Sequence, residues 1–236
     1  MVRKATRKIK NYLIKYLGLY QAEVSVDISF TAFFTAVTLF FTGLLLKDFK
    51  ELSLKYTSFI EIPIIFLILS VSGFLYSTLI YANATGKFLK IASKRFAKRI
   101  LNKSEFERCI LLGTTISEYL GVYFLILSIP LTINAISDIL FLRVIVLIMI
   151  LLGLWFYHAS GFCVMKRHFK KHHFTFLSFI FILETAIFLG QILKNSIIAY
   201  ISCFLLIFLI LSLASYIFIN SKKIIENLEK KKTFGL

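Results

Sequence analysis

Positively charged residues alternate along this chain in step with six long apolar runs. The first, third, fifth and last polar segments carry 6, 8, 4 and 5 Lys and Arg residues. The segments between them carry only Lys47, Lys50, Lys55 and Lys194, and Arg143 alone falls inside an apolar run. Cytoplasmic loops of helical membrane proteins are enriched in Lys and Arg, and the loops on the other side are not. The pattern therefore predicts an all-α integral membrane protein with both termini in the cytoplasm.

The composition agrees with this class, because 58% of the 236 residues are hydrophobic and only 17% are charged. Lipid accommodates that much apolar surface, whereas the core of a small soluble domain does not. The six predicted transmembrane helices form three out-and-back hairpins and cover residues 28–46, 62–84, 109–129, 139–158, 174–193 and 197–219. The transmembrane domain is thus residues 28–219, between a basic amphipathic segment, 1–27, and a basic cytoplasmic tail, 220–236.

Two basic segments outside the spans have the periodicity of amphipathic helices. Residues 2–20 repeat apolar side chains every three or four positions, which predicts a helix lying in the membrane interface. Residues 86–103 repeat the pattern and predict a second interfacial helix or a cytoplasmic extension of the second span. Pro130 is expected to end or kink the third span, and Gly73-x-x-x-Ser77 is a small-residue pair typical of close helix packing.

The formal net charge of +16 bears on the partners of the protein. In a soluble protein this charge would suggest nucleic acid. Here most of the basic residues set the topology, and they also suit an inner leaflet rich in anionic lipid. We therefore expect a multi-pass plasma-membrane protein whose partner is the bilayer, with a cytoplasmic or membrane protein as a further partner and no nucleic acid.

Two acidic residues lie inside apolar runs, Glu118 in the third predicted span and Glu184 in the fifth. Both fall near the middle of their predicted spans, where a charge costs ~2.5–3.5 kcal/mol on insertion scales. Such residues usually face the interior of a helix bundle or a wet cavity, so we expect at least one to be neutral or to share a bound cation. The alternative is that they hydrogen-bond a neighbouring helix and have a purely structural role.

Each of the three outward-running spans carries a polar stripe at helical spacing. The candidate residues of a polar path are Glu118, Glu184, Thr31, Thr35, Thr38, Thr42, Gln191 and Asn195. Hydroxyl, amide and carboxyl oxygens suit protons and small cations. Arg143 lies near the outer edge of the fourth span, where it either extends to the headgroups or forms an ion pair with one of the two acids.

All four histidines fall at the inner end of the fourth span or in the basic loop after it, near Cys163. They are His158, His168, His172 and His173. His168 and His172 have the spacing of a metal-binding pair, but the surrounding Lys and Arg repel cations, so a solvated basic loop is the simpler interpretation. Because no catalytic, nucleotide-binding or paired-cysteine motif is present, we expect no metal, no cofactor and no enzymatic activity.

These features favour a transporter or channel-like subunit with a polar path for protons or cations, lined by the first, third and fifth spans. Two alternatives stay open. In outline the chain is similar to small six-span exporter permeases of ABC type, which also have an interfacial N-terminal helix and a cytoplasmic coupling helix after the second span. That resemblance implies a permease subunit driven by a separate ATPase. The other alternative is a non-transporting scaffold or assembly factor that binds partners through its basic loops.

Overall fold

The computed structural model describes residues 2–47, 59–92, 108–160, 163, 169 and 172–233, and nearly all of them are helical. The helices are α1 (Val2–Lys47), α3 (Glu61–Ala92), η1 (Ser117–Tyr123), α5 (Phe124–Ile136), α6 (Leu140–Ser160), α8 (His173–Ile192) and α9 (Ser196–Thr233). Helical residues 108–116 run directly into η1 and α5, and together they form the third span. Within the described part, six helical segments are long and apolar enough to cross a membrane. The chain is therefore a multi-pass membrane protein.

The positions of the six predicted spans agree with these helices, with one clear difference in the third. Pro130 does not end the third span, which continues to Ile136, so the gap of residues 130–138 expected between the third and fourth spans shrinks to residues 137–139. Proline removes one backbone N–H, but an unwound backbone in lipid would expose many more unpaired polar groups. The helix therefore continues past Pro130, which is buried.

The two flanking basic segments also differ from the expected pattern. Residues 2–20 are helical, but they belong to the single long helix α1 and not to a separate interfacial helix. Helix α9 likewise continues past the predicted end of the sixth span, at residue 219, into the basic tail. Of the predicted amphipathic segment 86–103, residues up to Ala92 extend α3, and the remainder lies outside the described residues.

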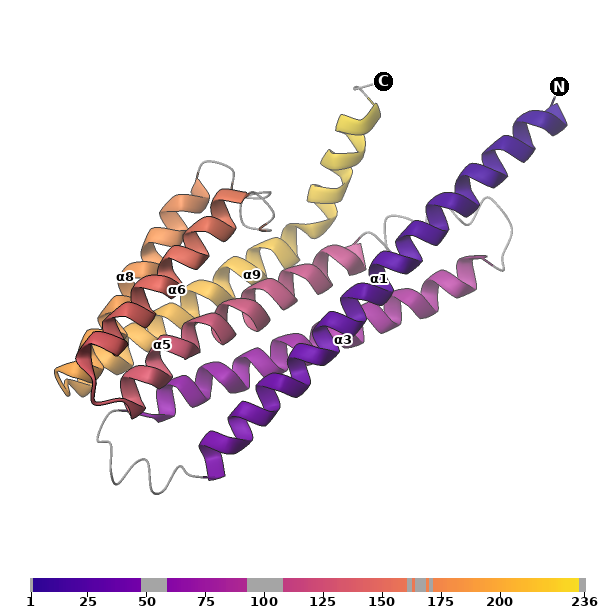
Figure 1. The fold of residues 1–236 in the computed structure, drawn as a ribbon. Coiled ribbons are helices and arrows are strands. Elements are labelled where there is room, and N and C mark those ends of the chain that lie inside the picture. Colours follow the sequence, from indigo (N-terminus) through magenta and orange to yellow (C-terminus); the bar gives the residue numbers. More distant parts are fainter. Residues whose placement is uncertain are drawn as a thin grey trace.

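The third span is the central element of the bundle (Figure 1). Helix α3 packs against η1 and α5, and α1 packs along α3. Helix α5 also contacts α6 and α8, η1 contacts α9, and α8 packs along α9. The start of α1 and the end of α9 project from one end of the bundle, which we call the terminal end. The opposite end, where residues 137–139 and 193–195 connect helices, is called the turn end. The direction in which the bundle crosses the membrane stays a prediction from the charge pattern.

Small residues bring α3 and the third span into close contact, as the small-residue pair predicted. Ser70 Oγ donates to the carbonyl oxygen of Gly121 over 2.8 Å, and Ser77 Oγ donates to that of Gly113 over 2.7 Å. A Cβ atom added at Gly73 would lie 2.5 Å from the backbone nitrogen of Gly121. The two backbones therefore touch directly at Gly73.

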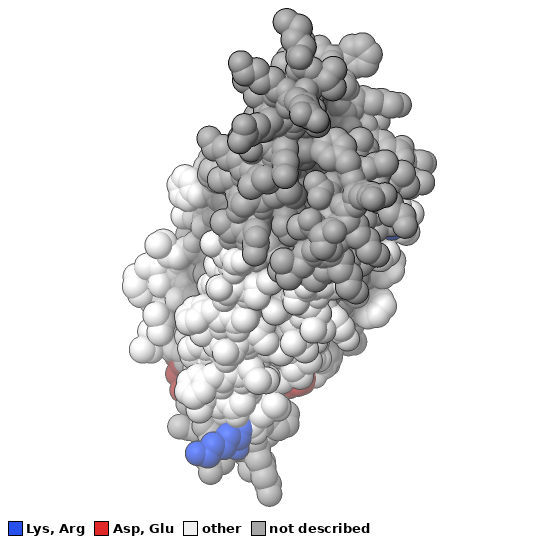
Figure 2. Space-filling model, turned by 90° about the vertical axis from the view of Figure 1, so that its right-hand side faces the viewer, with Lys and Arg blue, Asp and Glu red and all other residues white. Residues whose placement is uncertain are grey.

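Large apolar side chains cover the outside of the bundle. Phe141 on α6 and Ile219 on α9 are each 76% exposed, whereas Phe66, Tyr119 and Phe124 are fully buried in the interior. Figure 2 shows one face on which the described surface is almost uncharged and most of the visible charged side chains lie toward the lower end of the view. An apolar exterior of this kind is suited to contact with lipid.

Candidate functional site

A short π-helix, η1, positions the first group of candidate residues. In a π-helix each N–H donates to the carbonyl oxygen five residues earlier. Such turns are rare in proteins, and those that occur are often found at functional sites. η1 carries Glu118, Tyr119 and Tyr123, which are 5%, 0% and 0% exposed. The three side chains are therefore held inside the bundle, in the only π-helical stretch of the described residues.

Glu118 is bound by a tyrosine of α6. Tyr157 Oη donates to Glu118 Oε2 over 2.9 Å. Tyr157 lies only three residues before the end of α6, and Glu118 lies ten residues after Arg108, about 15 Å along the third span. Because the third span extends to Ile136, Glu118 lies on the terminal side of its midpoint, about four residues or 6 Å from it.

His158 is the centre of a buried polar group at the same end. It is 0% exposed, its Nε2 is hydrogen-bonded to the hydroxyl of Tyr123, and its Nδ1 lies 3.5 Å from Cys163 Sγ. The ring stacks on that of His173, with centroids 6.1 Å apart and planes 7° apart. We define the histidine cluster as Glu118, Tyr119, Tyr123, Tyr157, His158, Cys163 and His173.

The expectation of a solvated histidine loop is wrong for two of the four histidines. His158 and His173 are buried, because α6 extends past His158 and α8 begins at His173, so that both rings face the bundle. His172 is exposed, and His168 lies outside the described residues. No group of three or more His, Cys, Asp or Glu side chains in the described part of the chain is arranged to hold a metal ion.

The row Cys163–His158–Tyr123 has the chemistry of a proton relay. A neutral imidazole carries one donor and one acceptor nitrogen, whereas a thiol and a hydroxyl can each donate or accept. The imidazole can therefore donate to the thiol and accept from the hydroxyl, or the reverse. The two arrangements differ by a shift of protons along the row. The Tyr119 ring stacks on Tyr123 at 5.6 Å and extends the buried aromatic wall.

Glu184 lies alone in the middle of α8. It is 0% exposed, and neither carboxyl oxygen has a hydrogen-bond partner among the described residues. His173, Glu184 and Gln191 share one buried face of α8, because eleven and seven residues bring a helix back to nearly the same side. The spacings along the axis are about 16 Å and about 10 Å at 1.5 Å per residue.

Two amides meet near the turn end and form what we call the amide pair, Asn134 and Gln191. Asn134 Nδ2 donates to Gln191 Oε1 over 2.8 Å and to the carbonyl oxygen of Phe188 over 3.0 Å. Both amides are buried. Sequence reasoning missed Asn134 as a site residue, because it falls between the third and fourth predicted spans. The one feature of the sequence that could have indicated a helix there is that no glycine ends the apolar segment before Asn134.

Asn195, in contrast, lies at the surface and caps a helix. Its Oδ1 accepts a hydrogen bond from the backbone N–H of Ile198 over 3.2 Å at the start of α9. The preceding residue, Lys194, has a φ of 52° in the tight turn between α8 and α9. Asn195 is exposed, so it does not share the interior with Glu184 and Gln191.

The threonine stripe of α1 faces α3. Thr31, Thr38 and Thr42 are buried and Thr35 is partly buried. Each hydroxyl donates to a backbone carbonyl one turn earlier in α1, and Thr78 Oγ1 of α3 donates to Thr31 Oγ1 over 2.8 Å. Because α1 packs along α3, and α3 packs on the third span, the stripe lies in a different interface from Glu118 and Glu184.

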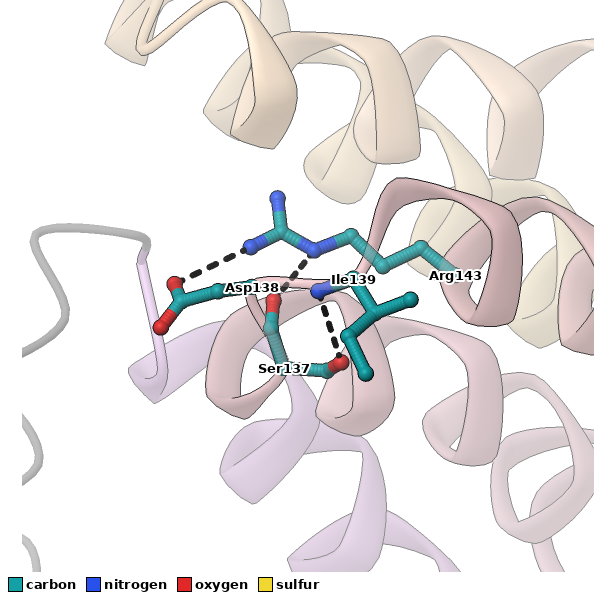
Figure 3. A network of polar contacts seen from close by, with 4 residues as sticks. All are labelled: Ser137, Asp138, Ile139 and Arg143. Atoms are coloured by element: carbon teal, nitrogen blue, oxygen red, sulfur yellow. Dashed lines mark hydrogen bonds and ion pairs between the residues drawn. The ribbon is translucent and has the colours of Figure 1, made fainter.

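Arg143 is held at the turn end by neighbouring residues (Figure 3). Its Nε donates to the carbonyl oxygen of Ser137, and its Nη2 lies 3.6 Å from Asp138 Oδ1. The Asp138 side chain is 85% exposed, and exposed pairs of this kind contribute only ~0–1 kcal/mol. The ion-pair partner of Arg143 is therefore Asp138 and neither of the two buried acids.

The histidine cluster, Glu184 and the amide pair are the candidate functional site. They succeed one another along the buried face of α8, from the terminal end to the turn end. No family model, curated protein or solved structure matches this chain.

Proposed function

We propose that this multi-pass membrane protein moves protons or a small cation across the membrane, as a transporter or a channel-like subunit. The observation that carries the proposal is Glu184, a fully buried carboxyl group in the middle of a membrane-spanning helix. Buried polar groups in proteins are nearly always hydrogen-bonded, and each exception calls for an explanation. For Glu184 the explanation that we propose is that its carboxyl group binds a mobile proton or cation.

The cost of burying this group supports a functional role. An acidic side chain at the centre of a membrane helix costs ~2.5–3.5 kcal/mol on insertion scales. The described neighbours supply no hydrogen bond that would offset the cost. Leucine or isoleucine would fill the same space without this penalty. The negative charge of Glu184 has to be balanced by a proton or a cation, and exchange of that species is the proposed activity.

The groups on either side of Glu184 suit a gated path better than an open pore. The histidine cluster lies about 16 Å away along α8 and the amide pair about 10 Å away. Buried Leu177 and Ile180 fill the first interval, and Ile187 fills part of the second. Protons do not cross apolar gaps of this length directly, so transfer requires water entry or movement of the helices. The expected turnover is that of a transporter or a gated channel.

Flux measurements on the purified protein test the proposal. The protein is reconstituted into vesicles that enclose a pH-sensitive dye, and a potassium diffusion potential drives proton entry. Separate vesicles carry sodium- and potassium-sensitive dyes. The wild type should conduct one of the three ions, and Glu184→Gln, which keeps the shape of the side chain but cannot exchange a proton, should abolish that flux. Asp138→Asn removes an exposed carboxyl at the turn end and should leave the flux unchanged.

Two outcomes contradict the proposal. One is a wild-type protein that conducts none of the three ions under any of these gradients. The other is a Glu184→Gln variant that folds, inserts and conducts as well as the wild type. Either result would assign the buried carboxyl a structural role.

A second candidate is a non-transporting scaffold, and the interhelical hydrogen bonds favour it. Ser70, Ser77 and Asn134 each donate to the backbone of a neighbouring helix, as polar residues that hold membrane helices together commonly do. A scaffold would form a stable complex with another protein and show no flux alone or in that complex. Purification from the native membrane followed by the same flux assay separates the two candidates.

A further inference from the structure

An apolar groove opens on the outside of the bundle between the third span, α9 and α3. Its volume is about 420 Å³. Residues at helical spacing on the third span form one wall, and residues at the same spacing on α9 form the other. Leu112 and Phe218 line the groove toward the terminal end, Leu120 and Leu211 line it toward the turn end, and Tyr76 of α3 also lines it. Ser215 is exposed and lies between Leu211 and Phe218 on α9.

A basic side chain lies at the terminal end of this groove. Arg108 Nε donates to Ser221 Oγ over 2.9 Å, and this contact joins the first residue of the third span to α9. Arg108 is one helical turn before Leu112, and Ser221 is just beyond Phe218. The Arg108 side chain is exposed, and the bond to Ser221 uses one of the five N–H donors of a guanidinium group. No carboxylate in the described part of the chain forms an ion pair with it.

We propose that this groove binds one acyl chain of an anionic phospholipid, whose headgroup phosphate is bound by Arg108. Guanidinium groups bind phosphate through paired, charge-assisted hydrogen bonds. From residue 112 to residue 120 the groove runs about 12 Å along the helix. One leaflet of a bilayer contributes about 15 Å of hydrocarbon. The groove therefore has the length of an acyl chain that starts at a headgroup beside Arg108 and ends near the middle of the bilayer.

The charge of the neighbouring sequence supports an anionic lipid as the occupant. Residues 85–107, directly before Arg108, contain seven Lys and Arg residues and two Glu residues. Basic residues at the edge of a membrane attract anionic headgroups, and basic pockets between transmembrane helices bind them specifically. The walls of the groove are mostly apolar and open to the lipid side, which excludes a free phosphate ion as the main occupant. This inference does not depend on the proposed transport function.

Lipid binding to the purified protein tests the assignment. The protein is exchanged into lipid nanodiscs of phosphatidylcholine with increasing phosphatidylglycerol, and retained lipid is measured by native mass spectrometry. The variants are Arg108→Gln, Arg108→Lys and Ser215→Phe, the last of which fills the groove with an aromatic ring. The matched controls are Lys47→Gln, which removes a positive charge at the turn end, and Leu205→Phe, which adds the same ring to an exposed position of α9 outside the groove.

The wild type should retain phosphatidylglycerol in preference to phosphatidylcholine. Arg108→Gln should weaken that retention about fivefold, the factor that corresponds to one basic residue near a membrane surface. Ser215→Phe should weaken it at least as much, Arg108→Lys should keep it within about twofold of the wild type, and both controls should behave as the wild type.

Four results would overturn the proposal. They are equal retention of the two lipids by the wild type, unchanged retention in Arg108→Gln, unchanged retention in Ser215→Phe, and failure of Arg108→Lys to retain the anionic lipid.

Discussion

Gly73 offers the sharpest test of how the bundle is packed. It lies on α3 where the backbone of the third span passes directly beside it. A Cβ added there would be 2.5 Å from the nitrogen of Gly121 and 2.6 Å from both the carbonyl carbon and the Cβ of Leu120. Two of these three atoms belong to the backbone, which cannot rotate away as a side-chain end can. Gly73→Ala therefore has to push α3 and the third span apart.

The size of the effect follows from these distances. Unstrained carbon contacts are about 3.5–4.0 Å long, so the helices must separate by about 1 Å. Overpacking of this kind typically costs ~1–3 kcal/mol. The same movement weakens the hydrogen bonds of Ser70 and Ser77 to the third span, each worth ~0.6 kcal/mol in a membrane. The better helix propensity of Ala returns up to ~1 kcal/mol. The net loss in the free energy of unfolding should be about 1–3 kcal/mol.

Unfolding in mixed micelles with increasing SDS measures this loss. The single tryptophan, Trp155, provides a fluorescence signal from α6, and circular dichroism reports the helix content. Gly43→Ala on α1 is the matched control, because a Cβ added at Gly43 meets no atom within 4 Å. The control should be as stable as the wild type or slightly more stable.

The comparison of Gly73→Ala with Gly43→Ala tests whether α3 and the third span are in backbone contact at Gly73. If Gly73→Ala unfolds at the same SDS fraction as Gly43→Ala, the helices are not in backbone contact at this point. The π-helix and the buried groups that it positions would then have no rigid neighbour in α3, and the packing argument would fail.

A double-mutant cycle of Asn134→Leu and Gln191→Leu, measured in the same SDS assay, should give a coupling free energy of about 0.6 kcal/mol and at most about 1.7 kcal/mol, the range measured for hydrogen bonds between membrane helices. Strictly additive losses in the free energy of unfolding would show that the two amides do not hydrogen-bond each other. In a cysteine-free background, a cysteine at the exposed Asp138 should react with an impermeant maleimide from outside the cell, and one at the exposed His172 only from the cytoplasm. The reverse result would overturn the topology inferred from charge. As a single cysteine, the fully buried Cys163 should react only after unfolding, so fast labelling of the native protein would contradict its burial.

Span number and position follow from the sequence because the membrane imposes them. A backbone in lipid must satisfy its own hydrogen bonds, so apolar runs of about 20 residues become helices whatever their neighbours are. The same reasoning placed Glu118 and Glu184 inside helices, and the small-residue spacing at Gly73 correctly indicated close packing. Span ends were predicted less well, since helices α1 and α9 continue into their basic flanks and the third span continues past Pro130.

The rotation of each helix about its axis was decided only by the tertiary structure. Hydropathy cannot separate an interior face from a lipid-facing one, because both are apolar in a membrane protein. The threonine stripe therefore looked like part of a path, although it packs against α3. His158 was expected at the solvated inner end of the fourth span, although it lies buried between Tyr123, Cys163 and His173.

The π-helix is a second reason why helix rotation could not be predicted from the sequence. Its wider turn changes the angular position of every side chain that follows it in the third span, and nothing in the periodicity of residues 117–123 indicates where that turn occurs. The sequence alone thus determined that the chain forms six helices long and apolar enough to cross a membrane, and that Glu118 and Glu184 lie within them. Which of those groups meet depends on helix rotation, which only the packing of neighbouring helices against one another decides.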